Sequence, residues 1–241
     1  MGPAGVRTGI PSTNITIRNV SSNGIAGIAI GSEMSGGVSD VVIEDLVGTG
    51  EMGIDVKSGK GRGGYIRNGT RTPPARPRPL GCSCSVSRVV RAVTFRRFRQ
   101  VFGHTKCTAE YCGDIAPRSY GDGSEGWIQL EPNGDDCGDC PDNCNCSLIP
   151  QVHDIRFEDL HAEGNKQIDP GQLQCLPEAP CTGVVFDDVR YFGNRGDGGD
   201  QHQPGAFRCS NVQGTARGFE TGTRHFEAER PIAAVCSGEL P

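Results

Sequence analysis

The chain has 241 residues, which is enough for one domain with a sizeable core. Its 36 glycines, 16 prolines and aromatic content of only 6% favour turns and short strands over long amphipathic helices, so the composition predicts an all-β protein. The net charge of -5 excludes a general attraction to nucleic acid or anionic membranes, and no run of about 18 apolar residues is present that could cross a bilayer.

The cysteines and glycosylation motifs predict an oxidising compartment. The chain has 12 cysteines, an even number that suits disulfides, and Asn-x-Ser/Thr sequons at Asn14, Asn19, Asn68 and Asn145. The first residues nevertheless lack the apolar core of a signal peptide. We therefore expect a secreted or cell-wall protein that is truncated at its N-terminus.

One short pattern recurs along the chain and predicts strands. β-Branched and apolar residues alternate with polar ones, and an acidic or amide residue followed by an apolar residue closes the clearest copies, at 14–20, 40–46 and 154–160; the two other copies are weaker. The first copy begins at Asn14, the second at Asp40 and the third at Ala92, so the second interval is twice the first. In chain order the copies are 14–20, 40–46, 92–98, 154–160 and 184–189.

The spacing of these copies predicts the architecture. A second short strand falls between copies, at 27–30 and again at 53–57. Repeats in the twenties with two strands each fit the coils of a parallel β-helix, a solenoid. A β-sandwich is the alternative, because it also strings short strands between glycine-rich turns.

Two segments break the strand pattern. Residues 69–88 are rich in Pro, Arg and Cys and have no strand period, so we expect an irregular insert. Residues 103–147 hold six of the 12 cysteines, and only 127–130 resemble a strand, so we expect a Cys-rich loop excursion from the coils. The predicted organisation is therefore coils over 1–68, the insert, and further coils over 89–241 that include this excursion and an irregular C-terminal tail.

Four of the cysteines in the excursion admit two interpretations. Cys137, Cys140, Cys144 and Cys146 could hold zinc as four thiolates, or they could form disulfides. Disulfides are favoured, because the spacing is not that of a paired Cys-x-x-Cys site and the sequon at Asn145 suits a secreted protein. The five histidines show no metal or triad spacing, so we expect no metal and no cofactor.

Residues 11–68 resemble the polygalacturonase family of glycoside hydrolases, in particular its plant-like branch. Three runs carry the resemblance: Pro11 to Asn19, Gly27 to Val38 with its Ile-Gly-Ser-Glu-Met-Ser-Gly-Gly, and Gly59 to Asn68. Weaker similarity returns at 148–163 and 207–214. The resemblance implies a right-handed parallel β-helix and inverting hydrolysis of α-1,4-galacturonan, the backbone of pectin.

The catalytic residues of that family have no counterpart here. Inversion needs one carboxylic acid and one carboxylate, which the family carries in Asn-x-Asp and Gly-Asp-Asp strands ahead of the Ile-Gly-Ser segment. No aspartate precedes Ile30 in this chain. Gly134-Asp135-Asp136 repeats the letters but leads into another Cys-rich turn. We therefore expect no catalytic residue and no activity from this chain alone.

The resemblance suggests two substrate-binding residues. The family's Arg-Ile-Lys, whose cations hold a substrate carboxylate, appears as Asp55-Val56-Lys57, and alternation places Asp55 and Lys57 on one face. Asp55 should repel a uronate and pair with Lys57. We expect Lys57 to contact substrate, with Arg62 as a second cation; a solvated lysine and a purely structural turn are the alternatives.

A cluster of four arginines lies between Arg91 and Arg99. We expect Arg96, Arg97 and Arg99 to straddle both faces of a strand, so that they form a solvated edge rather than a patch for pectin or nucleic acid.

Two functions are compatible with these observations. The first is a pectin-hydrolysing enzyme of carbohydrate metabolism and cell-wall organisation, of which this chain is a truncated or wrongly assembled form. The second is a non-catalytic carbohydrate-binding or structural β-helix. In either case we expect a monomer whose partner is a polysaccharide rather than nucleic acid or a membrane.

Overall fold

The computed structural model describes residues 11–24, 27–31, 37–50, 53–60, 65–67, 93–102, 127–135, 149–164, 170–193, 206–222 and 224–237. Apart from the short 3-10 helix η2 (Ile232–Val235), the regular elements in these ranges are β-strands, so the predicted all-β class is confirmed. No membrane-spanning helix occurs among the described residues. The predicted insert 69–88 and most of the Cys-rich region lie outside these ranges.

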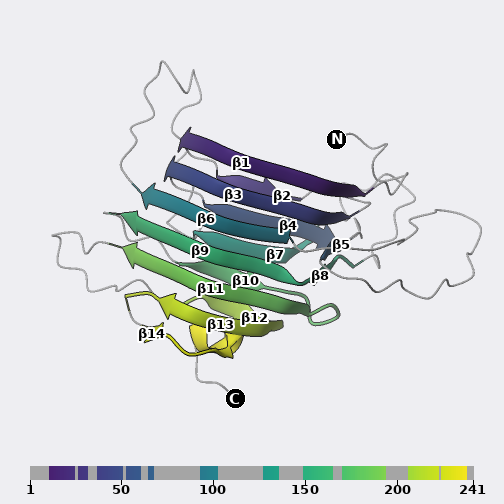
Figure 1. Cartoon of the computed structure of the whole chain (residues 1–241). Helices are drawn as coiled ribbons and strands as arrows, with labels where there is room; N and C mark the ends of the chain where they lie inside the picture. The colour runs from purple at the N-terminus through teal and green to yellow at the C-terminus, as the bar shows by residue number, and fades with distance from the viewer. Residues whose placement is uncertain are drawn as a thin grey trace, which may run out of the picture.

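The strands form two sheets, and the chain passes between them (Figure 1). We call the larger one sheet A and the smaller one sheet B. The long strands of sheet A lie side by side in chain order, and the short strands of sheet B lie behind them in the same order. Sheet A contains β1 (Ser12–Gly24), β3 (Val38–Gly50), β5 (Tyr65–Arg67), β6 (Val93–Phe102), β8 (Gln151–His153), β9 (Ile155–Gly164), β11 (Cys181–Gly193), β13 (Val212–Glu220), β14 (His225–Phe226) and β15 (Arg230–Pro231); sheet B contains β2 (Ile28–Ile30), β4 (Ile54–Lys60), β7 (Ile128–Asp135), β10 (Gly171–Gln174) and β12 (Arg208–Ser210).

The strands pair in parallel, with the exception of the short β14 and β15, which run antiparallel to β13. A β-sandwich is built from antiparallel strands, so that alternative is wrong for the described part of the chain. Parallel strands that alternate between two sheets are consistent with a β-helix.

The register explains the two intervals in the sequence. β1 pairs with β3, with Ile15 beside Val41, and β3 pairs directly with β6, with Val41 beside Val93. No further sheet A strand lies between β3 and β6 at this point of the register. The longer interval is therefore one enlarged repeat and not two repeats, as the doubling suggested.

Left-handed residues recur at two positions of the sheet A strands. The first position is held by Asn14, Asp40, Asp154 and Gly183, and the second by Asn19, Asp45, Arg97, Asp159, Asp188 and Gly218, with φ between 52° and 67° throughout. Asn, Asp and Gly tolerate this conformation best, which explains why an amide or acidic residue closes four of the five copies of the sequence pattern. At each position the chain bends and the alternation of side chains is interrupted.

The bend at Arg97 overturns the expected placement of the arginines. Strict alternation would send Arg96 and Arg97 to opposite faces, but Arg97 has a φ of 52°. Phe95 and Phe98 consequently both face the core, while the side chains of Arg96, Arg97 and Arg99 are 39%, 44% and 46% exposed on the outer face of sheet A. β6 is also an interior strand, between β3 and β9, and not an edge.

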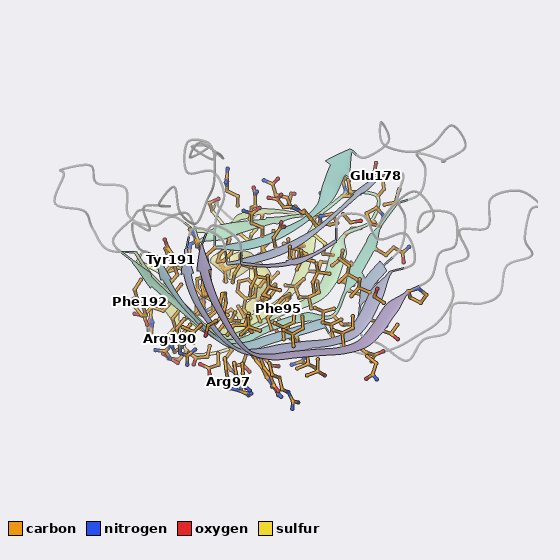
Figure 2. All side chains as sticks on the ribbon, turned by 90° about the horizontal axis from the view of Figure 1, so that it is seen from above. Phe95, Arg97, Glu178, Arg190, Tyr191 and Phe192 are labelled. Atoms are coloured by element: carbon orange, nitrogen blue, oxygen red, sulfur yellow. A yellow bond between two sulfur atoms is a disulfide. The ribbon has the colours of Figure 1, made fainter. Side chains whose placement is uncertain are left out.

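The space between the sheets is filled by apolar side chains that stack on their counterparts in neighbouring strands. Phe95, Phe157 and Phe186 occupy one row of the register. The ring centres of Phe95 and Phe157 are 5.4 Å apart, and those of Phe157 and Phe186 are 5.1 Å apart. Figure 2 shows Phe95 between the sheets, whereas Arg97 and Arg190 point outward.

The C-terminal segment covers the last coil. β14 and β15 pair with β13, and Ile232 and Val235 of η2 are buried against it. A disulfide between Cys209 and Cys236 ties this segment to β12, and a second one joins Cys175 to Cys181 across the turn between β10 and β11. These two bridges fit the expected oxidising compartment.

The register also predicts how the chain tolerates a deletion. Val38 pairs with Ile66 of β5, whereas Val41 pairs with Val93 of β6. The extra residues of this repeat therefore lie between Arg67 and Val93 in the sequence. Deleting residues 69–92 joins Asn68 to Val93 and places Asn68 opposite the left-handed Asp40. We expect this variant to keep the strand pairing and to gain up to about 3 kcal/mol in free energy of unfolding, because the connection between β5 and β6 has fewer residues to order; denaturant titration measures this gain.

A deletion that is one residue longer is the matched control. Removing residues 68–92 shifts the strand by one position and turns its core side chains outward, so cooperative unfolding should be lost. Equal stability of the two deletions would contradict the proposed register.

The phenylalanine row predicts a second outcome. Phe157→Ala should lower the free energy of unfolding by about 3–5 kcal/mol, because it opens a cavity between two neighbouring rings. Phe192→Ala is the control on the same sheet, since Phe192 is 46% exposed, and it should cost less than about 1 kcal/mol. Similar losses in urea titrations of the two variants would contradict the described core.

Candidate functional site

The outer face of sheet B carries a continuous set of polar side chains. Its strands alternate, so that Ile54, Val56, Ile128, Leu130 and Leu173 face the core while the residues between them face outward. We call the outward set the sheet B face: Asp55, Lys57, Gln129, Glu131, Gln172, Gln174, Arg208 and Ser210.

The register aligns these side chains across the strands. Asp55 lies beside Gln129, Gln129 beside Gln172, and Gln172 beside Arg208. Lys57 lies beside Glu131 in the neighbouring row. Strands are about 4.8 Å apart, so the face presents a polar group at that interval along the stack.

The best-defined interaction on this face is an ion pair within β4. The Lys57 Nζ lies 2.9 Å from Asp55 Oδ2, which confirms that the two side chains share a face and pair with each other. The Asp55 side chain is only 7% exposed, whereas that of Lys57 is 45% exposed. The second carboxylate oxygen of Asp55, Oδ1, is buried and accepts no hydrogen bond.

The neighbouring strand β2 fixes the backbone below Lys57. Gly31, at the end of β2, has a φ of 107°, and a Cβ at this position would lie 1.6 Å from the carbonyl oxygen of Lys57. Only glycine allows this approach. Gly31 therefore permits the close approach of β2 to the strand that carries the ion pair.

Sequence reasoning located part of this face. It placed Asp55 and Lys57, while Arg62 lies outside the described residues, as does Asp136 of the Gly-Asp-Asp run. It missed the glutamines at 129 and 172 and also Arg208. The alternation over 127–130 and 171–174 was the available signal, but only the register brings these distant residues into one row.

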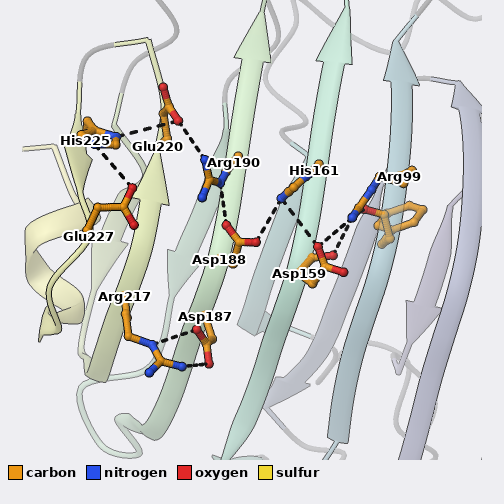
Figure 3. A network of polar contacts seen from close by, with 11 residues as sticks. Arg99, Asp159, His161, Asp187, Asp188, Arg190, Arg217, Glu220, His225 and Glu227 are labelled. Atoms are coloured by element: carbon orange, nitrogen blue, oxygen red, sulfur yellow. Dashed lines mark hydrogen bonds and ion pairs between the residues drawn. The ribbon is translucent and has the colours of Figure 1, made fainter.

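The outer face of sheet A is charged, but its charges are internally paired. Arg97 Nε lies 2.5 Å from Asp45 Oδ1, and Arg99 Nη2 lies 2.7 Å from Asp159 Oδ1. Figure 3 shows how such pairs continue across β9, β11 and β13 to the C-terminal segment. The arginine cluster is thus largely neutralised by neighbouring carboxylates, which favours the solvated interpretation over a polyanion-binding patch.

Glu44 lies at the centre of the arginines of this face. Arg18 and Arg96 flank it in register on either side, both in contact with its carboxylate, and Arg97 Nη2 lies 2.9 Å from it. The hydrogen bond from Arg96 holds the pKa of Glu44 below its ordinary value, and the positive charges of Arg18 and Arg96 add to this effect against the opposing effect of desolvation.

Asp159, His161 and Asp188 offer possible metal ligands within 4.8 Å of one another. Their carboxylates are already engaged, however, because Arg99 lies 2.7 Å from Asp159 and Arg190 lies 2.5 Å from Asp188. Although partial burial raises it, the hydrogen bond and charge of Arg190 leave the pKa of Asp188 below its ordinary value. Two adjacent guanidinium groups oppose a further cation, so this cluster is explained as part of the ion-pair network.

A hollow of about 450 Å³ lies on sheet A between β1 and β9. Its lining includes Asn19, Arg97 and Arg99. Since both arginines are paired with carboxylates of the same lining, the hollow has no excess positive charge to recognise a uronate. The sheet B face contains Lys57, the residue that the sequence predicts to contact substrate, and is therefore the candidate site.

Comparison with known proteins gives one informative similarity. Part of the chain is 46% identical over 67 residues to a probable polygalacturonase from Vitis vinifera. The match covers 27% of this chain and 14% of that protein's length, so the chain corresponds to a small part of it. No family model matches the chain. No solved structure matches it either. The similarity supports a partial relation to polygalacturonases, a class of glycoside hydrolase.

The position of Glu44 predicts a pH dependence of stability. A carboxyl group with a lowered pKa in the folded state stabilises the fold above its ordinary pKa of 4.5, and this contribution is lost as the pH falls below that value. Glu44→Gln should therefore flatten the loss of stability between about pH 6 and pH 3. Melting temperatures across this range test the prediction, and an unchanged slope in the variant would contradict it.

Proposed function

We propose that the chain is part of a glycoside hydrolase of the polygalacturonase type, folded as a right-handed parallel β-helix, and that it contributes a surface for binding pectin. The observation that carries the proposal is the position of Lys57. It lies in the segment that resembles the family, on a parallel strand, within a face of polar side chains aligned along the stack.

The chemistry of the sheet B face supports a polysaccharide partner. Sugars are recognised through hydroxyl groups that both donate and accept hydrogen bonds. The amide of the half-buried Gln172 can do the same, and Lys57 and Arg208 add donors. An extended polymer that runs along the stack would pass a further polar side chain at each strand. Arg62, which follows Lys57 closely in the sequence, is proposed as a further contact.

A non-catalytic carbohydrate-binding or structural role is the second candidate, and one observation favours it. Residues 1–30, which lead up to the Ile-Gly-Ser segment, contain no aspartate of the kind that the family uses for acid and base catalysis. On either proposal the protein acts outside the cell or in the cell wall. The two disulfides and the sequons support this location.

Binding to pectin tests the proposed surface. We expect affinity electrophoresis to show that the chain is retarded by pectin, and that the double variant Asp55→Ala/Lys57→Ala binds about tenfold more weakly. Removing both partners avoids stranding a buried charge. The matched control is Asp187→Ala/Arg217→Ala, which removes an ion pair from the outer face of sheet A and should leave binding unchanged. If both double variants weaken pectin binding equally, the sheet B face is not the binding surface.

An assay for new reducing ends separates the two candidates. Without the family aspartates we expect the chain to bind polygalacturonate or its esters without cleaving them. Sustained release of reducing ends by the purified chain would contradict this expectation and show that other carboxylates perform the hydrolysis.

A further inference from the structure

The ion pair on β4 changes what Lys57 can recognise. An ammonium group with no anionic neighbour is a natural partner for the carboxylate of a uronic acid. Here the Nζ of Lys57 is already 2.9 Å from Asp55, and Glu131 lies beside Lys57 in the register. Asp55, Lys57 and Glu131 together carry a net charge of -1, so the centre of the face does not attract an anion.

Opening the pair to admit an anion is also unfavourable. The Asp55 side chain is 7% exposed, and its Oδ1 accepts no hydrogen bond, so Asp55 depends on Lys57 for compensation of its charge. A substrate carboxylate that drew Lys57 away would leave a nearly buried anion without its cation. Lys57 can bind a ligand without this loss only if the ligand leaves the pair in place.

An uncharged sugar meets that condition. Lys57 has three N–H donors and is 45% exposed, so it can donate to a hydroxyl or carbonyl oxygen while still paired with Asp55. The neighbouring Gln129, which is buried, and the half-buried Gln172 are neutral. Lys57 and Gln172 can bind hydroxyls and ester carbonyls, whereas a row of free carboxylates would face Asp55 and Glu131 at close range.

We propose that the Asp55–Lys57 pair makes this face selective for methyl-esterified galacturonan over the free acid. The inference rests on the proposed pectin-binding function and specifies its substrate class. Asp55 acts as a specificity-determining residue, because it both neutralises Lys57 and repels a uronate. Arg208, two strands beyond β7, provides a cation away from this pair and does not alter the charge at its centre.

Calorimetric titration of the full chain with oligogalacturonides of equal length, either fully methyl-esterified or fully de-esterified, tests the selectivity. We expect the ester to bind at least about tenfold more tightly than the acid. Asp55→Asn, which is nearly isosteric, should raise affinity for the acid by about tenfold and abolish the preference. Asp187→Asn removes the same charge from sheet A and should keep the preference.

The salt dependence of the unmodified chain gives a readout that requires no variant. Repulsion of the acid is screened at high ionic strength. The ratio of the dissociation constants for the acid and the ester should therefore fall as salt is added. This measurement applies even if Asp55→Asn folds poorly.

The other outcomes overturn specific statements. Tighter binding of the free acid by the unmodified chain would reject the selectivity and leave the pectin-binding function intact. An unchanged preference in a folded Asp55→Asn variant would reject the role of Asp55. Failure to bind either oligogalacturonide would reject the proposed function and this inference with it.

Discussion

In-register parallel pairing is the constraint on which the rest of the structure depends. Because each strand of a sheet repeats the direction and phase of its neighbour, a side chain lies over its counterpart one coil away. This places Phe95, Phe157 and Phe186 in one interior row and Arg18, Glu44 and Arg96 in one exterior row. The same rule aligns Asp55 with Gln129 and Lys57 with Glu131 on sheet B. The core and the candidate site are thus two consequences of one register.

The sequence predicts the strands well, because alternation is a local property. All five copies of the pattern overlap strands, and so do 27–30, 53–57 and 127–130, but most of the strands extend several residues beyond the predicted ranges. Local patterns do not report which strands are neighbours. The doubled interval before β6 suggested two repeats, and only the pairing of Val41 with Val93 shows a single enlarged repeat. For the same reason the strand pattern alone could not separate the parallel arrangement from a sandwich, and the expectation of a parallel β-helix came from the family resemblance.

Side-chain placement could be predicted where alternation is unbroken and not elsewhere. Asp55, Val56 and Lys57 follow strict alternation, so their shared face and their ion pair were predictable. Arg97 occupies a left-handed position that the other coils fill with Asn, Asp or Gly, and an arginine there gives no sequence signal of the bend. The remaining members of the sheet B face were missed because a row is assembled from strands that are distant in the sequence, as those of Gln129 and Gln172 are.

The two ends of the described stack differ in the elements that cover them. At the C-terminal end, antiparallel strands, η2 and the Cys209–Cys236 bridge cover the last coil. At the other end β1 pairs on one side only among the described residues, and Ile15 is 38% exposed. A pulling force or a protease that acts on the C-terminal segment must therefore disrupt strand pairing and a disulfide before it exposes β13.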